Sequence, residues 1–120
     1  MKRIEVLDKA LEQQIRDVRA EGINPTLLAA YRTSLKVGND KINFDEVIWD
    51  TEIEEITKAL KAYGVCEITI SSHFSGLIPT LVKFEQNGFQ MAGLTEVTAG
   101  YTDFLTNTYA RIPAIRLINI

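Results

Sequence analysis

The fold class is decided by the stretch CEITISSHFSGLIPTLVKFEQ, residues 66–86. Its first five residues alternate apolar and polar side chains and are rich in β-branched residues, which is typical of a strand. The apolar residues that follow at helical spacing are Leu77, Leu81 and Phe84. Pro79 would remove a backbone hydrogen bond deep inside a helix, so we expect this helix to begin near Ser75 and to end at Asn87-Gly88. The stretch therefore predicts a strand followed directly by a helix.

Three helices are expected before this strand. Apolar side chains recur every three or four positions over residues 4–18, 27–35 and 53–63, a spacing that lines one face of a helix. Asn24-Pro25 supplies the second helix with an N-cap and a first-position proline. Gly64 is suited to end the third helix, because glycine accepts the left-handed conformation that closes helices.

Residues 41–49, KINFDEVIW, are too apolar for a free loop. The pattern is compatible with a short strand and with an ordered loop held in place by its aromatic side chains. We expect the ordered loop, which makes residues 66–70 the first strand of the chain.

Two further strands are expected over residues 93–104 and 109–118, joined by a polar hairpin turn over residues 105–108. Pro113 cannot donate to a strand ladder, which places the last strand at an edge or at a bulge. The sequence thus predicts one α+β domain over residues 1–120. Three N-terminal helices are followed by a β-α-β-β unit with a small, largely antiparallel sheet.

The composition of the 120 residues, 46% apolar and 24% charged, is that of an ordinary folded domain. The net charge is −3 and the basic side chains are scattered, so duplex nucleic acid is not an expected partner. No apolar run approaches the roughly 20 residues of a membrane span, and the charged N-terminus does not resemble a signal peptide. We therefore expect a cytoplasmic protein without membrane contact.

The sequence contains no pattern typical of a catalytic or metal site. Cys66 is the single cysteine, which leaves no metal-ligand pair, and its place in the predicted strand suggests a buried side chain. His73, the single histidine, could act as a base beside a serine, but no G-x-S-x-G elbow is present. We expect no metal, no cofactor and no catalytic residues, hence a non-enzymatic protein.

A candidate anion site lies where the predicted strand passes into the helix after it. Its residues are Ser72, His73, Ser75 and Gly76. The free N–H groups at a helix N-terminus attract anions, and small side chains let a phosphate or carboxylate approach the backbone. The alternative is that a serine caps the helix and Gly76 allows close packing. Neither the dinucleotide nor the P-loop glycine motif is present.

A candidate partner-binding set consists of aromatic residues near loops and in the terminal hairpin. They are Trp49, Tyr101, Phe104 and Tyr109. Aromatic side chains often contribute most of the binding energy at the centre of a protein interface. The hairpin rings could equally form cross-strand pairs that stabilise the sheet. A homodimer is a further possibility, because an exposed terminal strand can pair with its copy.

Three stretches of the sequence carry a resemblance to a known family. They are ITISSHFSGLIPTLVKFEQNGFQMAGLTEV at residues 68–97, GYTDF at 100–104 and IPAIRL at 112–117. They resemble a family of small uncharacterised proteins from Firmicutes that are often encoded on mobile genetic elements. Pro79 and Phe104 depart from the family pattern, in which an acidic residue and a tryptophan are expected. No functional residues are carried over from the family.

The resemblance implies a small accessory protein that binds and blocks host defence machinery. Together with the missing active-site patterns, it favours a non-enzymatic inhibitor of a defence nuclease complex, of the anti-CRISPR or anti-restriction type, acting by protein–protein contact. The alternative is a small anion- or nucleotide-binding domain that uses the turn over residues 71–76.

Overall fold

The computed structural model describes residues 1, 3–15, 23–45, 48, 50–71 and 76–119. The elements in chain order are α1 (Glu5–Ile15), α2 (Pro25–Val37), β1 (Ile42–Phe44), α3 (Asp50–Ala62), β2 (Glu67–Ile70), α4 (Leu77–Gln86), β3 (Phe89–Thr102) and β4 (Tyr109–Asn119). The predicted α+β class is confirmed. None of the helices described is both long and apolar enough to cross a membrane.

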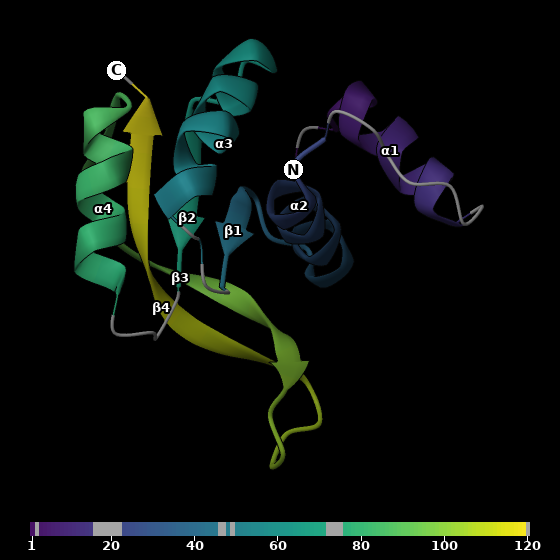
Figure 1. Ribbon diagram of the computed structural model, residues 1–120. Helices are drawn as coiled ribbons and strands as arrows, with labels where there is room; N and C mark the ends of the chain where they lie inside the picture. The colour runs from purple at the N-terminus through teal and green to yellow at the C-terminus, as the bar shows by residue number, and fades with distance from the viewer. Residues whose placement is uncertain (2, 16–22, 46–47, 49, 72–75, 120) are drawn as a thin grey trace.

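The described strands form one mixed sheet in the order β1-β2-β4-β3. β1 runs parallel to β2, whereas β4 is antiparallel to both of its neighbours. Figure 1 shows α3 and α4 beside the sheet, α2 next to β1, and α1 on the far side of α2. β3 and β4 continue past the helices as a long hairpin (Figure 1).

The hydrophobic core gathers side chains from the sheet and from all four helices. Its largest fully buried members include Leu7, Leu27, Tyr31, Phe44, Ile53, Ile56, Leu60, Ile68, Phe84 and Phe89. The ring of Phe84 lies between two others, with centroids 6.4 Å from Phe44 and 6.1 Å from Phe89. The helical spacing of α4 therefore fixes this helix against both β1 and β3.

Residues 42–44 form a strand, so the expected ordered loop over 41–49 is wrong at its start. Ile42 pairs with Ile68 and Phe44 pairs with Ile70, and all four side chains are buried. Three residues carry too little periodicity to reveal a strand, which is fixed here by pairing with β2 more than twenty residues away. β1 interrupts the three predicted N-terminal helices, and the order becomes ααβαβαββ.

The helix ends follow the local chemistry of the sequence. The Asn24 side chain accepts a hydrogen bond from the Leu27 N–H at 3.0 Å and caps α2, as predicted. Gly38 and Gly64 have φ of 78° and 74°, the left-handed region in which glycine is favoured. Pro79 lies in the first turn of α4, where its missing N–H disrupts no intrahelical bond.

Cys66 is exposed, which contradicts the prediction of a buried thiol inside a strand. β2 begins one residue later, at Glu67. Cys66 belongs to the turn after α3, and its carbonyl accepts from the Asn119 N–H at 2.7 Å. The alternation of residue types alone could not show at which residue β2 begins.

The first strand of the terminal hairpin, β3, begins four residues earlier than predicted. β3 begins at Phe89 rather than at residue 93, because the buried Phe89 ring packs against Phe84. The ladder with β4 shifts register between Met91 and Gly93, where Gly93 has a φ of 117°. The glycine therefore marks a bulge within the strand rather than its start. Phe104 lies in the connecting turn, beyond the end of β3.

Pro113 occupies a position on β4 where only β3 is its neighbour. The ladder between β2 and β4 covers residues 115–118 alone. The predicted edge strand is therefore wrong, since β4 lies inside the sheet, and Pro113 is tolerated because the ladder with β2 does not reach it. Pro113 faces Glu96, and since proline has no N–H, this is a non-hydrogen-bonded pair.

Each edge strand has one residue whose outward backbone groups are bound by a side chain. Thr98 lies two residues after Glu96 on β3, so its N–H and C=O also point away from β4. The Asn39 side-chain amide accepts from this N–H at 2.8 Å and donates to this C=O at 2.9 Å. On β1, the Asn43 N–H donates to Ser34 Oγ at 2.9 Å. Both edges are thereby partly closed to strand addition.

Candidate functional site

The tip of the β3–β4 hairpin is a compact turn closed by its own hydrogen bonds. The Asp103 N–H donates to the Thr108 C=O at 2.6 Å, and the Asn107 N–H donates to the Asp103 C=O at 2.9 Å. The Asp103 carboxylate accepts from the Leu105 N–H at 2.8 Å. Asn107 takes a left-handed φ of 54°, which asparagine tolerates well. The backbone of the tip is therefore ordered by local contacts.

This ordered turn presents large apolar side chains to solvent. Phe104 is 97% exposed and Leu105 is 89% exposed. Tyr101 at the end of β3 is 56% exposed, and Tyr109 at the start of β4 is also exposed. Between residues 99 and 110 the only charged side chain is Asp103. The tip is thus an aromatic-rich surface with a single charge, and few charges beside aromatic residues are typical of interface centres.

The structure brings together three of the four predicted partner-binding residues. Tyr101, Phe104 and Tyr109 all lie at this end of the hairpin, whereas Trp49 lies outside the described residues. Sequence reasoning missed Leu105 by assigning it to a polar turn. An apolar side chain in a turn, directly after a phenylalanine, could have indicated an exposed apolar surface at this position.

The rings do not form the cross-strand pairs that were the structural alternative. Tyr109 is opposite Thr102 in the ladder, not opposite Tyr101. The aromatic pairs that the described residues contain are those of Phe84 with Phe44 and with Phe89. Phe104, at 97% exposed, therefore contributes little to the packing of the sheet, whereas Tyr101 and Tyr109, at 56% and 37%, are partly covered.

The predicted anion site is only partly visible. Ser72, His73 and Ser75 lie outside the described residues, so a site built on them stays a prediction. Gly76 precedes α4, and no side chain caps this helix at that position.

Ser71, at the end of β2, is a structural residue. Its Oγ accepts from Asn43 Nδ2 at 2.9 Å, and its N–H donates to the Phe44 C=O at 3.0 Å. Thr69 Oγ1 donates to the Asn43 side-chain oxygen at 2.8 Å. Among the described residues, every buried side-chain nitrogen and oxygen has a hydrogen-bond partner. This network ties β1 to β2 and uses the side chains of Asn43, Thr69 and Ser71.

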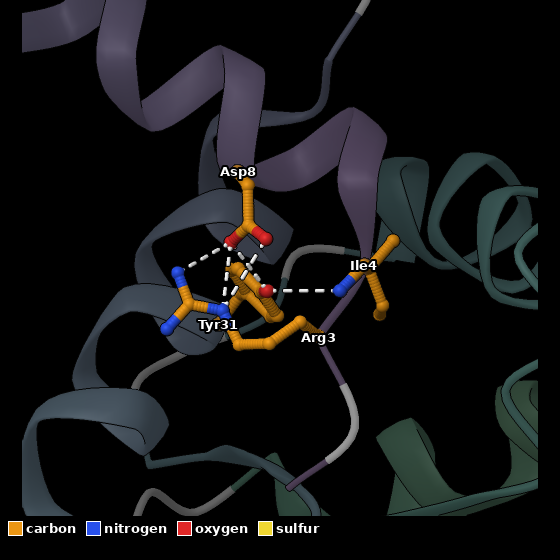
Figure 2. Close-up of polar contacts among 4 residues, drawn as sticks. All are labelled: Arg3, Ile4, Asp8 and Tyr31. Atoms are coloured by element: carbon orange, nitrogen blue, oxygen red, sulfur yellow. Dashed lines mark hydrogen bonds and ion pairs between the residues drawn. The ribbon is translucent and has the colours of Figure 1, made fainter.

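A second polar cluster joins the N-terminal segment to α2 (Figure 2). The hydroxyl of Tyr31 donates to Asp8 Oδ1 at 2.7 Å and accepts from the Ile4 N–H at 3.0 Å. Arg3 holds the same carboxylate with Nε and Nη2, the latter at 2.9 Å. These hydrogen bonds from Arg3, and then from Tyr31, keep the pKa of Asp8 below its usual value. Burial and the neighbouring carboxylate raise the pKa of Tyr31.

An open groove of about 570 Å³ separates the N-terminal segment from the turn after α3. One wall is formed by residues 1 and 3–6, and the other by residues 40–42 and 62–67, which include Cys66. In the part of the chain that the structure describes, no three His, Cys, Asp or Glu side chains gather as a metal site would require.

Comparison with known proteins assigns the chain to a family whose function is unknown. A family model described as a domain of unknown function, DUF7698, matches residues 26–119, from the first turn of α2 to the end of β4. No curated protein and no solved structure matches the chain. The matched part contains the whole sheet and the exposed hairpin, whereas α1 lies outside it. The chain therefore belongs to the DUF7698 family.

Proposed function

We propose that this chain is a non-catalytic protein-binding domain and that the tip of the β3–β4 hairpin is its contact surface. The observation that carries the proposal is the pair Phe104 and Leu105, almost fully exposed on a turn that is closed by its own hydrogen bonds. Such a turn loses little conformational freedom on binding, so more of the contact energy is available for affinity.

The composition of the tip favours a protein partner. Two tyrosines flank the apolar pair, and a tyrosine ring supplies a large contact area together with a polar hydroxyl. A narrow projecting tip fits a concave pocket better than a flat surface. Since Asp103 is the only charge nearby, we expect the affinity to depend weakly on salt.

The class of partner is proposed from the sequence resemblance to small proteins of mobile genetic elements. On that basis the protein acts in the cytoplasm as an inhibitor of a host-defence nuclease complex, of the CRISPR or restriction type. Blocking such a complex needs surface complementarity and no chemistry of its own.

Substitution at the tip tests the proposal. Phe104→Ala should leave the melting temperature unchanged, because the ring is exposed, and should weaken partner binding by about 2 kcal/mol, roughly thirtyfold. Ile78→Ala is the matched control, because Ile78 is 74% exposed on α4 and belongs to no proposed contact. Retention of a co-purifying protein from a bacterial lysate by the wild type and by Ile78→Ala, with loss by Phe104→Ala, is the expected result. Equal retention by all three proteins would refute the proposed surface.

The partner class has its own test. Expression of the chain in cells with an active CRISPR or restriction system should raise the transformation efficiency of a targeted plasmid, and Phe104→Ala should abolish this effect. Unchanged efficiency with the wild-type chain would reject the nuclease-inhibitor role while leaving the hairpin contact to be judged by the binding experiment.

A further inference from the structure

We propose that the protein forms a symmetric dimer in which β3 pairs antiparallel with β3 of a second copy, about a two-fold axis beside Thr95. The two sheets then become one, in the order β1-β2-β4-β3-β3′-β4′-β2′-β1′. The dimer does not involve the hairpin tip. It is supported by the backbone groups that β3 leaves open, by where that open stretch ends, and by the side chains that flank it.

The outer side of β3 is open over part of its length. β3 lies at one end of the sheet, and only β4 is its neighbour. Glu96 faces Pro113, which has no N–H to donate, so the N–H and C=O of Glu96 point away from β4. By the alternation of a strand, those of Leu94 point the same way.

These outward groups are available to another strand. In the part of the chain that the structure describes, the hydrogen bond found to them is a long one, 3.5 Å from Arg111 Nη2 to the Glu96 C=O. A carbonyl oxygen accepts two hydrogen bonds, so this contact leaves one position free. Open donors and acceptors along an edge strand are a template for pairing with a further strand.

The open stretch is short, and both of its ends are defined by the fold. On one side, the Asn39 side chain binds the outward N–H and C=O of Thr98. On the other side, the bulge before Gly93 interrupts the strand, and the Ala92 C=O accepts from an arginine side chain at 3.4 Å. An incoming strand can therefore pair only with the few residues between these two points.

A second copy of β3 matches this stretch in length and in the position of its ends. In an antiparallel pair about Thr95, Leu94 lies opposite Glu96 of the second copy, and their outward groups exchange hydrogen bonds on both sides of the axis. Thr98 then lies opposite Ala92 of the second copy, so pairing stops at the same place on both chains. Any longer extended peptide would continue past both points and meet backbone groups that are already bound.

The side chains of the open stretch suit a contact between two copies. Leu94 is 80% exposed and Met91 is 63% exposed. They lie on one face of the sheet, because their partners on β4 are Ile115 and Leu117, two residues apart. In the dimer the two Leu94 side chains are diagonal neighbours and cover one another. Glu96, the one charged residue of β3, lies directly opposite a leucine and not opposite its own copy.

Sizing of the purified chain between about 10 μM and about 1 mM tests the dimer. We expect the average mass to rise with concentration toward that of a dimer, because so short a pairing buries less surface than a standard interface. Leu94→Asp removes the leucine contact and sets a carboxylate opposite Glu96 on both sides of the axis, so it should weaken the dimer about tenfold or more. A wild-type chain that stays monomeric throughout overturns the proposal.

Two further variants serve as controls. Leu105→Asp introduces the same charge at an equally exposed leucine of the tip, and it should leave the dimer unchanged. Leu94→Lys sets an ammonium opposite Glu96 and should dimerise about tenfold more tightly than Leu94→Asp. Equal weakening by the aspartates at both positions would reject pairing through β3. Because Leu94→Asp leaves the tip intact and Leu105→Asp leaves the edge intact, failure of the dimer is distinguishable from failure of the hairpin contact.

A cysteine cross-link tests the register. In this pairing the two copies of Thr95 are directly opposite as a non-hydrogen-bonded pair, with Cα atoms about 4.5 Å apart, a separation that a disulfide spans. Thr95→Cys, in a Cys66→Ser background that removes the exposed native thiol, should form a covalent dimer in air about tenfold or more faster than Thr102→Cys. Thr102 is exposed on the same strand but lies beyond Thr98. Equal rates of cross-linking would reject the proposed pairing.

Discussion

The hairpin tip and the α1–α2 contact differ in how hydrogen bonds and apolar side chains are used. At the tip, backbone hydrogen bonds order the chain and the large apolar side chains stay in water. At α1, Leu7 and Ala10 are buried, and side-chain hydrogen bonds from Tyr31 and Arg3 secure the helix. We therefore expect substitutions of exposed side chains at the tip to cost little folding stability, and substitutions of the buried residues of α1 to cost more.

The largest effect expected from this comparison comes from a matched pair of leucines. Leu60 in α3 and Leu7 in α1 are both fully buried. Leu60→Ala should lower the free energy of unfolding by about 2–5 kcal/mol through lost burial and a residual cavity. Leu7→Ala should lower it less, because α1 packs on α2 and lies on the side of α2 away from the sheet (Figure 1). Urea denaturation measures both, and equal losses would make α1 an integral part of the core.

A smaller loss is expected at the base of the hairpin. Asn39→Ala removes both hydrogen bonds to the Thr98 backbone and should cost about 1–3 kcal/mol in the free energy of unfolding. Leu105→Ala in the exposed tip is the control and should change stability by less than about 0.5 kcal/mol, because this side chain is 89% exposed. Thermal denaturation of the two variants compares the base of the hairpin with its tip. A larger loss for Leu105→Ala would mean that the tip contributes to folding.

The smallest effect concerns pH at α1. The pKa of Asp8 is held below its usual value of 3.8, so the carboxylate favours the docked helix at neutral pH. This contribution disappears as the pH falls through the lowered pKa, where the carboxylate is protonated and Arg3 loses its partner. Hydrogen exchange at α1 should therefore accelerate in acid relative to exchange at β2. Asp8→Asn should remove that pH dependence, and an unchanged profile would assign it to other carboxylates.

Local sequence signals predicted most of the fold because local chemistry controls those parts. Asn24 caps α2, and Gly64 takes a left-handed conformation after α3. The spacing of apolar residues indicates α4. All three signals involve residues that are neighbours in the sequence. β1 could not be predicted in this way, since a strand of three residues exists only through its pairing with β2. The exposure of Cys66 depended likewise on where β2 begins.

The candidate site was predicted in part for a similar reason. Clustering of Tyr101, Phe104 and Tyr109 follows from the hairpin itself, which the sequence indicated. The contribution of Leu105 depended on the geometry of the turn, and the Tyr31–Asp8 contact joins residues more than twenty positions apart. The hydrogen bond from the Asn39 side chain to the Thr98 C=O is a long-range contact of the same kind.

The turn over residues 103–108 is closed entirely by its own members, and this has an evolutionary consequence. None of the bonds that close it involves the side chains of Phe104 or Leu105. Selection can therefore exchange these two side chains for others without first finding a compensating mutation elsewhere. A lineage that carries this fold can adapt to a changing partner by substitutions at these two positions, while the turn that presents them is kept.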